Sequence, residues 1–150
     1  MNRFVVDASV AIKWYLPEPH SADADRLLGN GFQLLAPDLL VIEAGNILWK
    51  RIMRSELTVR KAQIIMRALE ALPMTFYPAS VLAENAMTVA CGLKRSFYDS
   101  LYLALALTTD CRLVTADRKL FDAVRDSAPV RKHILWIEDV PERNDPDLRS

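Results

Sequence analysis

The sequence predicts an α/β domain in which a parallel β-sheet is covered by helices on both faces. Short β-branched segments alternate with longer helical ones along almost the whole chain, and this alternation favours crossover connections between parallel strands. The length of 150 residues suits one domain, and a hydrophobic share of 51% is enough to build a sizeable core. We expect the domain to span residues 1–140 and a flexible, polar tail to follow at residues 141–150.

The positions of aliphatic runs, prolines and glycines predict the individual elements. Strands are expected at residues 4–6, 32–36, 74–77, 112–115 and 134–137. Helices are expected at residues 9–16, 21–28, 38–54, 58–72, 79–91, 96–108 and 118–125. Asp38 is expected to cap the helix that it precedes, and Gly92 is expected to stop another. Functional sites of such sheets lie beyond the carboxyl ends of the strands.

Composition excludes several classes of protein. The 19 basic residues balance the 19 acidic ones, so contacts with nucleic acid must come from local patches and not from overall charge. The longest apolar run, residues 101–107, is too short to cross a bilayer, and the N-terminus carries no signal-peptide pattern. We therefore expect a cytoplasmic protein that has no membrane partner. Two cysteines can form neither a disulfide framework nor a zinc site by themselves.

Four acidic residues carry most of the chemical information. Asp7 ends the first expected strand and Asp117 follows the fourth, and each could equally cap the helix that comes next. Asp99 has the S-x-x-D spacing of a capping box, which also explains it locally. Glu43 has the weakest structural explanation, because it lies among apolar residues inside a long expected helix. Either a solvated helix face or a polar stripe facing a cleft would accommodate it.

Together these acids predict a metal site. Three of the four lie at ends of elements that an α/β sheet brings to one edge, where four carboxylates would repel unless protonated or neutralised. Oxygen ligands without cysteine or histidine suit Mg²⁺ or Mn²⁺ and not zinc. The natural reaction of such a site is metal-assisted attack of water on a phosphodiester.

Four motifs give the chain a family resemblance. They are V-V-D-A-S at 5–9, E-A-G-N at 43–46, F-Y-D-S-L-Y-L-A-L-A at 97–106 and L-V-T-A-D at 113–117. In order and approximate spacing they resemble the PIN-domain ribonucleases, and among these the VapC-like toxins of bacterial type II toxin–antitoxin pairs. The resemblance covers residues from about 3 to about 137 and implies a three-layer α/β/α domain with a five-stranded parallel sheet.

The resemblance also implies roles for individual residues. The catalytic, metal-binding acids would be Asp7, Glu43, Asp99 and Asp117. Supporting polar residues would be Ser9, Asn46 and Thr115. Asp122 either matches an additional acid of some family members or lies on a helix surface.

The implied function is that of a Mg²⁺- or Mn²⁺-dependent endoribonuclease, a hydrolase that acts as the toxin of a toxin–antitoxin pair. A metal-activated water would attack phosphorus and leave 5′-phosphate and 3′-hydroxyl ends. The implied partners are an RNA substrate, a cognate antitoxin protein bound in a groove near the site, and a second copy of the chain in a homodimer.

Basic residues near the acids are the expected RNA contacts. They are Lys50, Arg54, Lys94 and Arg95. Helical spacing places Glu43, Asn46 and Lys50 on one stripe, which makes Lys50 the preferred phosphate contact. A solvated helix face is the alternative for each of these charges.

Two rival functions remain open at this point. A phosphoaspartyl receiver or phosphatase is disfavoured, because the third strand ends without an aspartate and the first carries Asp7-Ala8-Ser9 where a phosphatase needs D-x-D. A non-catalytic scaffold with the same fold is the second rival. The intact set of four acids argues against it.

Overall fold

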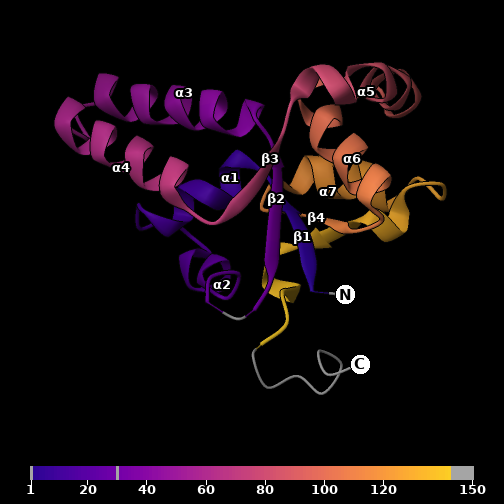
Figure 1. Cartoon of the computed structure of the whole chain (residues 1–150), viewed down its shortest axis with the longest axis horizontal. Helices are drawn as coiled ribbons and strands as arrows, with labels where there is room; N and C mark the ends of the chain where they lie inside the picture. Colours follow the sequence, from indigo (N-terminus) through magenta and orange to yellow (C-terminus); the bar gives the residue numbers. More distant parts are fainter. Residues whose placement is uncertain (1, 30, 143–150) are drawn as a thin grey trace.

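A five-stranded parallel sheet lies between helical layers in the computed structural model, which describes residues 2–29 and 31–142 (Figure 1). The strands are β1 (Arg3–Val6), β2 (Gln33–Pro37), β3 (Met74–Tyr77), β4 (Arg112–Thr115) and β5 (Ile134–Trp136). Their order in the sheet is β3-β2-β1-β4-β5, and every neighbouring pair is parallel. The predicted α/β class and three-layer architecture are therefore confirmed.

Helices connect the strands and cover both faces of the sheet. Those of the described ranges are α1 (Ala8–Ala11), α2 (Ser21–Asp25), α3 (Leu39–Met53), α4 (Val59–Ala71), α5 (Ala79–Leu93), α6 (Phe97–Thr109) and α7 (Arg118–Arg125). Three short 3-10 turns, η1 (Ile12–Trp14), η2 (Arg131–His133) and η3 (Ile137–Asp139), complete the described structure. Helices α3 and α4 lie side by side as an arm that projects from the sheet (Figure 1).

The strands are apolar on both faces because both faces are covered. Val5 of β1 is paired in register with Leu35 and Leu113, and these side chains enter the core beneath α3 to α6. Phe4 and Val6 enter the opposite core, which α2 and η3 cover. Central strand β1 is thus fully enclosed, so its carboxyl end is held rigidly at the edge of the sheet.

Helix α6 is buried along most of its length, as its nearly continuous apolar sequence predicts. Every residue from Ser100 to Ala106 is buried, and the helix packs across β1, β2 and β4. Its first turn, which carries Asp99, and its last turn, which carries the exposed Thr108, reach toward solvent.

Some expected boundaries were wrong. The helix expected at 9–16 is split into α1 and η1, and α2 stops at Asp25. Helix α5 continues through Gly92, because glycine weakens a helix but does not end it while its φ stays helical. The chain leaves the helix at Lys94, whose φ is +54°. The Asp38 side chain makes no cap, and its Oδ1 accepts a hydrogen bond of 2.9 Å from the amide of Ala79.

The end of the domain is described only in part. Val140 is buried in the core, and the expected tail lies outside the described residues from residue 143 onward. The boundary at residue 140 and the flexibility of the tail stay predictions. Within the described ranges, none of the helices combines the length and the apolar composition that a membrane crossing requires.

Candidate active site

Asp7 follows β1 directly and is buried at the carboxyl edge of the sheet. Its Oδ1 accepts hydrogen bonds from the hydroxyl of Ser9 at 2.6 Å and the amide of Val10 at 3.0 Å, and its Oδ2 accepts one from the hydroxyl of Thr115 at 2.7 Å. Burial raises the pKa of Asp7 to about 6, even though these hydrogen bonds lower it. Asp7 is therefore both the cap of α1 and a carboxylate that is costly to ionise.

The structure brings the four sequence-selected acids to one cavity of about 160 Å³, here called the acidic cavity. Its lining residues are Asp7, Ala8, Ser9, Glu43, Ile47, Asp99, Tyr102 and Asp117. They come from four separate parts of the chain, and they meet because the parallel sheet places the ends of β1 and β4 next to each other.

Thr115 and Asp117 complete the β4 side of the acidic cavity. The Thr115 hydroxyl donates to Asp7 and also accepts the backbone amide of Asp117 at 3.0 Å. Asp117 caps α7, since its Oδ1 accepts the amides of Lys119 at 3.0 Å and Leu120 at 3.2 Å. Its negative charge also contributes to the raised pKa of Asp7. A capping role and a place in the acidic cavity therefore coexist in one residue.

Glu43, on α3, is the acid that reaches the cavity from the helical layer. Its pKa is raised by burial and by the charge of Asp99, whereas the nearby Tyr102 hydroxyl lowers it. That hydroxyl is buried and has no well-formed hydrogen bond in the described part of the chain. Sequence reasoning missed Tyr102 because it lies in an apolar helix, although its i, i+3 spacing from Asp99 places both on one helical face.

Among residues 2–29 and 31–142, Asp99 is the one acid of the cavity that forms an ion pair. Arg95 Nη2 lies 3.0 Å from Asp99 Oδ2, and the Asp99 amide donates to the Ser96 hydroxyl at 3.1 Å in the expected capping geometry. Arg95, expected from the sequence to contact RNA, pairs with an acid of the cavity, and its contact with RNA stays a prediction. It offsets part of the negative charge there.

The other three expected RNA contacts, Lys50, Arg54 and Lys94, lie in three different parts of the structure. Lys50 and Asn46 line a cavity of about 530 Å³ that shares Glu43 and Ile47 with the acidic cavity. Arg54 caps the far end of α3, about 16 Å from Glu43 along the helix axis at the usual helical rise. Lys94 is exposed at the end of α5.

Asp122, the possible additional acid, lies on α7. It forms an ion pair of 3.1 Å with Arg125 on the same helix. It does not line the acidic cavity.

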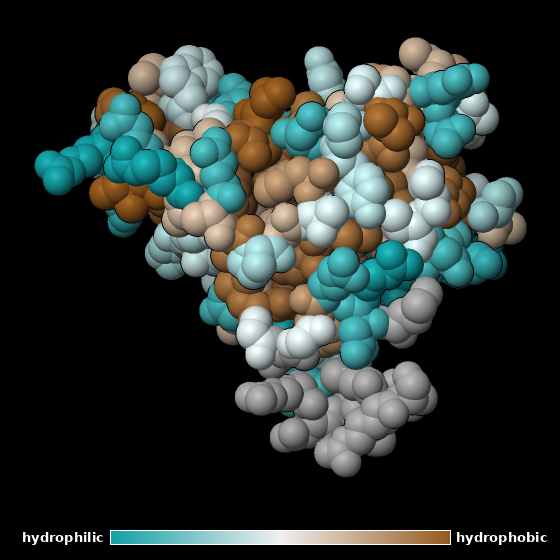
Figure 2. Space-filling model, viewed as in Figure 1, coloured by the Kyte–Doolittle hydropathy of each residue, from teal (hydrophilic) through white to brown (hydrophobic). Residues whose placement is uncertain are grey.

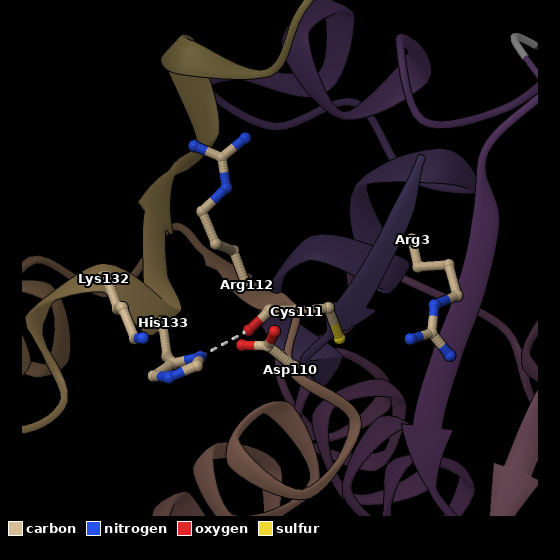
Figure 3. A pocket seen from close by; sticks show the side chains of 6 residues that line it. All are labelled: Arg3, Asp110, Cys111, Arg112, Lys132 and His133. Atoms are coloured by element: carbon tan, nitrogen blue, oxygen red, sulfur yellow. Dashed lines mark hydrogen bonds between the residues drawn. The ribbon is translucent and has the colours of Figure 1, made fainter. Parts of the chain in front are cut away.

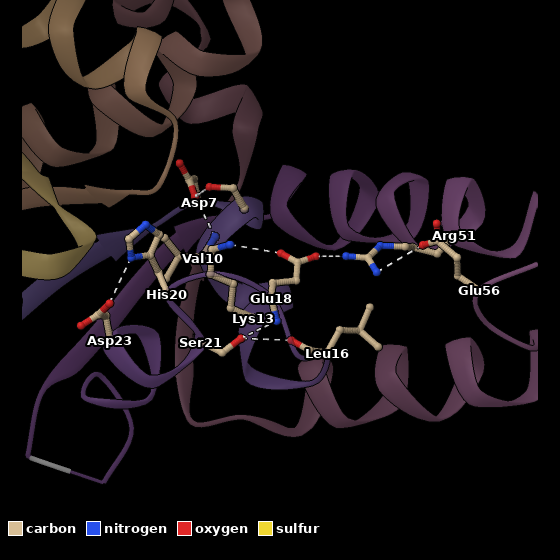
Figure 4. Close-up of polar contacts among 11 residues, drawn as sticks. Asp7, Val10, Lys13, Leu16, Glu18, His20, Ser21, Asp23, Arg51 and Glu56 are labelled. Carbon is tan, nitrogen blue, oxygen red and sulfur yellow. Dashed lines mark hydrogen bonds and ion pairs between the residues drawn. The ribbon is translucent and has the colours of Figure 1, made fainter. Parts of the chain in front are cut away.

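An ion-pair chain ties α3, which carries Glu43, to the segment after α1 (Figure 4). Lys13 Nζ lies 3.1 Å from one carboxylate oxygen of Glu18, and Arg51 pairs with the other oxygen of Glu18 and with Glu56. The Glu18 side chain is only 16% exposed, so these charges interact more strongly than surface pairs. The Arg51 guanidinium is therefore held between two carboxylates.

A different cavity, of about 220 Å³, lies at the amino ends of β1, β4 and β5, opposite the carboxyl ends where the acidic cavity lies (Figure 3). Its basic residues do not converge, since Figure 3 shows the Arg3 and Arg112 side chains extending away from each other. Arg3 donates to the carbonyl of Thr109 at 2.8 Å. His133 is buried there, with its Nδ1 3.0 Å from the Cys111 carbonyl oxygen.

The acidic cavity has the donor chemistry of a magnesium or manganese site. Its polar lining groups are carboxylate and hydroxyl oxygens, without histidine or cysteine. Among residues 2–29 and 31–142, however, no three acidic, histidine or cysteine side chains form a group that could hold an ion as they stand. Mg²⁺ generally keeps several waters and is held by one or two carboxylates together with substrate oxygens. The residues present fit an ion of that kind.

The fold and the acidic cavity agree with a family comparison. A family model described as the PIN domain matches residues 4–126, so the chain belongs to the PIN-domain family. A crystal structure of PAE2754 from Pyrobaculum aerophilum has the same fold, with a TM-score of 0.69 and 24% sequence identity over 91% of this chain and 84% of that one.

Curated relatives identify the branch of the family. Ribonuclease VapC3 of Pyrobaculum aerophilum is 34% identical over 122 residues, which are 79% of this chain and 92% of the relative. VapC ribonuclease Mb0985 of Mycobacterium bovis is 31% identical over 84% of this chain and 94% of its own length. Ribonuclease VapC1 of Mycobacterium tuberculosis is 32% identical over 80% and 90%. The chain is therefore a VapC-like PIN-domain protein, which confirms the resemblance seen in the sequence.

Proposed function

We propose that the protein is a metal-dependent endoribonuclease and the toxin of a toxin–antitoxin pair. The observation that carries this proposal is buried Asp7, held by three donors in a cavity that also contains Glu43, Asp99 and Asp117. Burial makes the ionised form of Asp7 costly unless a cation joins it. The names of the relatives, all ribonucleases, supply the substrate class.

Asp7 and Asp99 are the residues that we expect to hold the ion, with Glu43 and Asp117 completing the site. A bound divalent ion at this position would lower the pKa of a coordinated water and offset the charge of a scissile phosphate. The protein side chains orient the acids that would hold this ion. Ser9 and Thr115 hold the Asp7 carboxylate in one orientation, and a fixed orientation reduces the reorganisation that the reaction requires.

Lys50 is the residue that we expect to bind the substrate backbone on the α3 side. It lines the neighbouring cavity together with Glu43, so a phosphate next to the scissile one could reach it. Asn46, in the same cavity, can donate or accept a hydrogen bond with a base or a ribose.

The proposal is tested by cleavage of end-labelled RNA with Mg²⁺, with Mn²⁺ and with EDTA. Cleavage should require the metal and should leave 5′-phosphate ends, and Asp7→Asn or Asp99→Asn should abolish it. Asp110→Asn is the matched control, because Asp110 lies at the opposite edge of the sheet and asparagine tolerates its φ of +50°. Cleavage by Asp7→Asn at the parent rate would overturn the mechanism, and a metal-bound but inactive parent would favour the scaffold alternative.

We further propose an antitoxin protein and a second copy of the chain as partners. Large apolar side chains are exposed on α3, α5 and the first turn of α6, and Figure 2 shows apolar surface between hydrophilic groups on one face of the molecule. They include Ile42, Trp49, Met53, Val81, Met87 and Tyr98. Exposed apolar surface of this extent is typical of protein interfaces. Sedimentation that shows only monomer at micromolar concentration would remove the dimer from the proposal.

A further inference from the structure

Arg118 is an exposed cation whose guanidinium is fixed by aromatic rings and not by a carboxylate. Its Cζ lies 4.0 Å from the centroid of the Trp136 ring and 5.4 Å from that of Phe121. Within the described parts of the chain, its guanidinium forms no ion pair or hydrogen bond. Stacking covers one face of the guanidinium and leaves its N–H groups available to an anion.

The aromatic support of Arg118 is itself held in place. Trp136 is 9% exposed, its Nε1 donates to Glu138 Oε1 at 3.1 Å, and its ring lies 5.7 Å from that of Phe121. A guanidinium stacked on such a fixed surface loses little conformational freedom when it binds a ligand. Arg118 is therefore preorganised in a way that Lys50 and Lys94 are not.

Strand register places the backbone of Trp136 next to that of Thr115, at the end of β4 where the acidic cavity lies. Trp136 is the partner of Thr115 in the β4–β5 pairing, and the Thr115 hydroxyl binds Asp7. Arg118 also follows Asp117 directly, and Asp117 lines the cavity. Lys50 lies on the α3 side of the cavity, so Arg118 supplies a cation on the side where the sequence had suggested none.

The position of Arg118 in α7 is unfavourable for the helix. The first turn of α7 carries Arg118 and Lys119 and no acid. The helix dipole disfavours cations at an N-terminus, where it favours acidic groups such as the capping Asp117. The two basic residues of this first turn therefore do not stabilise α7. Binding of an anionic ligand at the start of the helix would explain why they are there.

We propose that Arg118, stacked on Trp136, binds a backbone phosphate of the RNA strand on the β5 side of the acidic cavity, an inference that rests on the proposed function. An RNA strand that crosses the cavity then has a cation on each side, Lys50 and Arg118. The scissile phosphate lies between them, over the four acids. This arrangement offsets the repulsion between the acids and the phosphates that flank the cleavage point.

The test measures RNA binding separately from cleavage. A fluorescein-labelled single-stranded RNA is titrated, with Mg²⁺ present, against protein that carries Asp7→Asn and, in addition, Arg118→Gln or Arg125→Gln. Arg125 is the matched control, since its Cζ also lies 5.4 Å from the Phe121 ring on the same helix but it is paired with Asp122 and Asp126. Thermal melts of all variants check that the fold is unchanged.

Arg118→Gln should weaken RNA binding about five- to tenfold near 0.1 M salt. A plot of the logarithm of the binding constant against the logarithm of the salt concentration should become less steep by about 0.7, the value expected for the loss of one phosphate contact to a single strand. Arg125→Gln should change neither quantity. In otherwise unaltered protein, Arg118→Gln should raise KM and leave kcat within about twofold, as expected for loss of uniform binding.

The outcomes separate this inference from the proposed function. If RNA binds with the same affinity and salt slope to the Arg118→Gln protein as to its parent, the phosphate contact is wrong while the ribonuclease proposal stands. If the parent does not bind RNA at all, both are wrong. An equal loss with Arg125→Gln would assign the effect to overall charge and would also overturn the contact.

Discussion

The hydroxyl of Thr115 donates a hydrogen bond of 2.7 Å to the carboxylate of Asp7, across 108 residues of the chain. The contact follows from the register of β1 and β4, which pairs Val6 with Val114 and so brings the next residue of each strand together. Because the same hydroxyl accepts the amide of Asp117, one side chain orients two acids of the cavity.

Thr115→Val should destabilise the protein more at pH 8 than at pH 5. At pH 8 the charged Asp7 loses a buried donor, and losing one partner of a buried hydrogen bond costs about 1–3 kcal/mol. At pH 5 Asp7 is largely protonated, since its pKa is about 6, and depends less on that donor. Urea unfolding at both pH values measures the difference. Thr108→Val is the control. Among the described residues, the Thr108 hydroxyl bonds only to the Ala104 carbonyl of its own helix, so the cost of this change should not depend on pH.

Asp7→Asn should stabilise the metal-free protein at neutral pH. The pKa of Asp7 rises from an ordinary 3.8 to about 6 on folding, so the folded state binds more protons than the unfolded state between these values. The free energy of unfolding of the parent therefore falls as the pH rises from about 4 to about 6, by about 3 kcal/mol in total.

Asparagine cannot ionise, so Asp7→Asn should remove this part of the pH dependence. Denaturant unfolding of both proteins at intervals from pH 4 to pH 8, without divalent ions, measures the effect as the difference between the two curves. A difference that stays constant across this range would show that Asp7 is not costly to ionise.

Asp117→Asn and Asp117→Ala should separate the capping role of Asp117 from its charge. Asparagine keeps the cap on α7 and removes the repulsion with Asp7, so metal-free stability should hold or rise. Alanine also removes the cap and should be about 1 kcal/mol less stable than asparagine.

Millimolar Mg²⁺ should then raise the Tm of the parent more than that of either Asp117 variant, because a ligand stabilises the folded state only where it binds. Thermal melts of the three proteins with and without Mg²⁺ supply the comparison. An equal Mg²⁺ shift in all three, with RNA cleavage retained, would assign Asp117 to capping alone.

Arg95→Gln should tighten the binding of Mg²⁺. The Arg95 guanidinium pairs with Asp99 at 3.0 Å, so an ion that uses Asp99 must compete with it. We expect the half-saturating Mg²⁺ concentration in a thermal-shift titration to fall about fivefold, equivalent to about 1 kcal/mol. Arg60→Gln, an exposed cation on α4, should leave it unchanged. A half-saturating concentration unaltered by Arg95→Gln would exclude competition at Asp99.

The sequence by itself determined the fold class and the order of its elements. Apolar runs such as Phe4-Val5-Val6 and the buried Ser100–Ala106 segment specify their elements by local pattern, because a strand or helix enclosed on all sides must be apolar on all sides. The four acids could also be selected from the sequence, since Glu43 has no local explanation and the others stand at element ends. Helix ends were less predictable, because Lys94 adopts a left-handed conformation that its residue type does not favour.

Only the tertiary structure decided how the charges are paired. Arg95 and Arg118 both precede or follow an acid closely in the sequence, yet Arg95 pairs with Asp99 whereas Arg118 stacks on Trp136. Tyr102 lies in an apolar helix, and only the tertiary arrangement of α3 and α6 around the acidic cavity brings its hydroxyl to Glu43. The physical reason is that burial and electrostatic interaction depend on distances in space between segments far apart in the chain, which local periodicity does not encode.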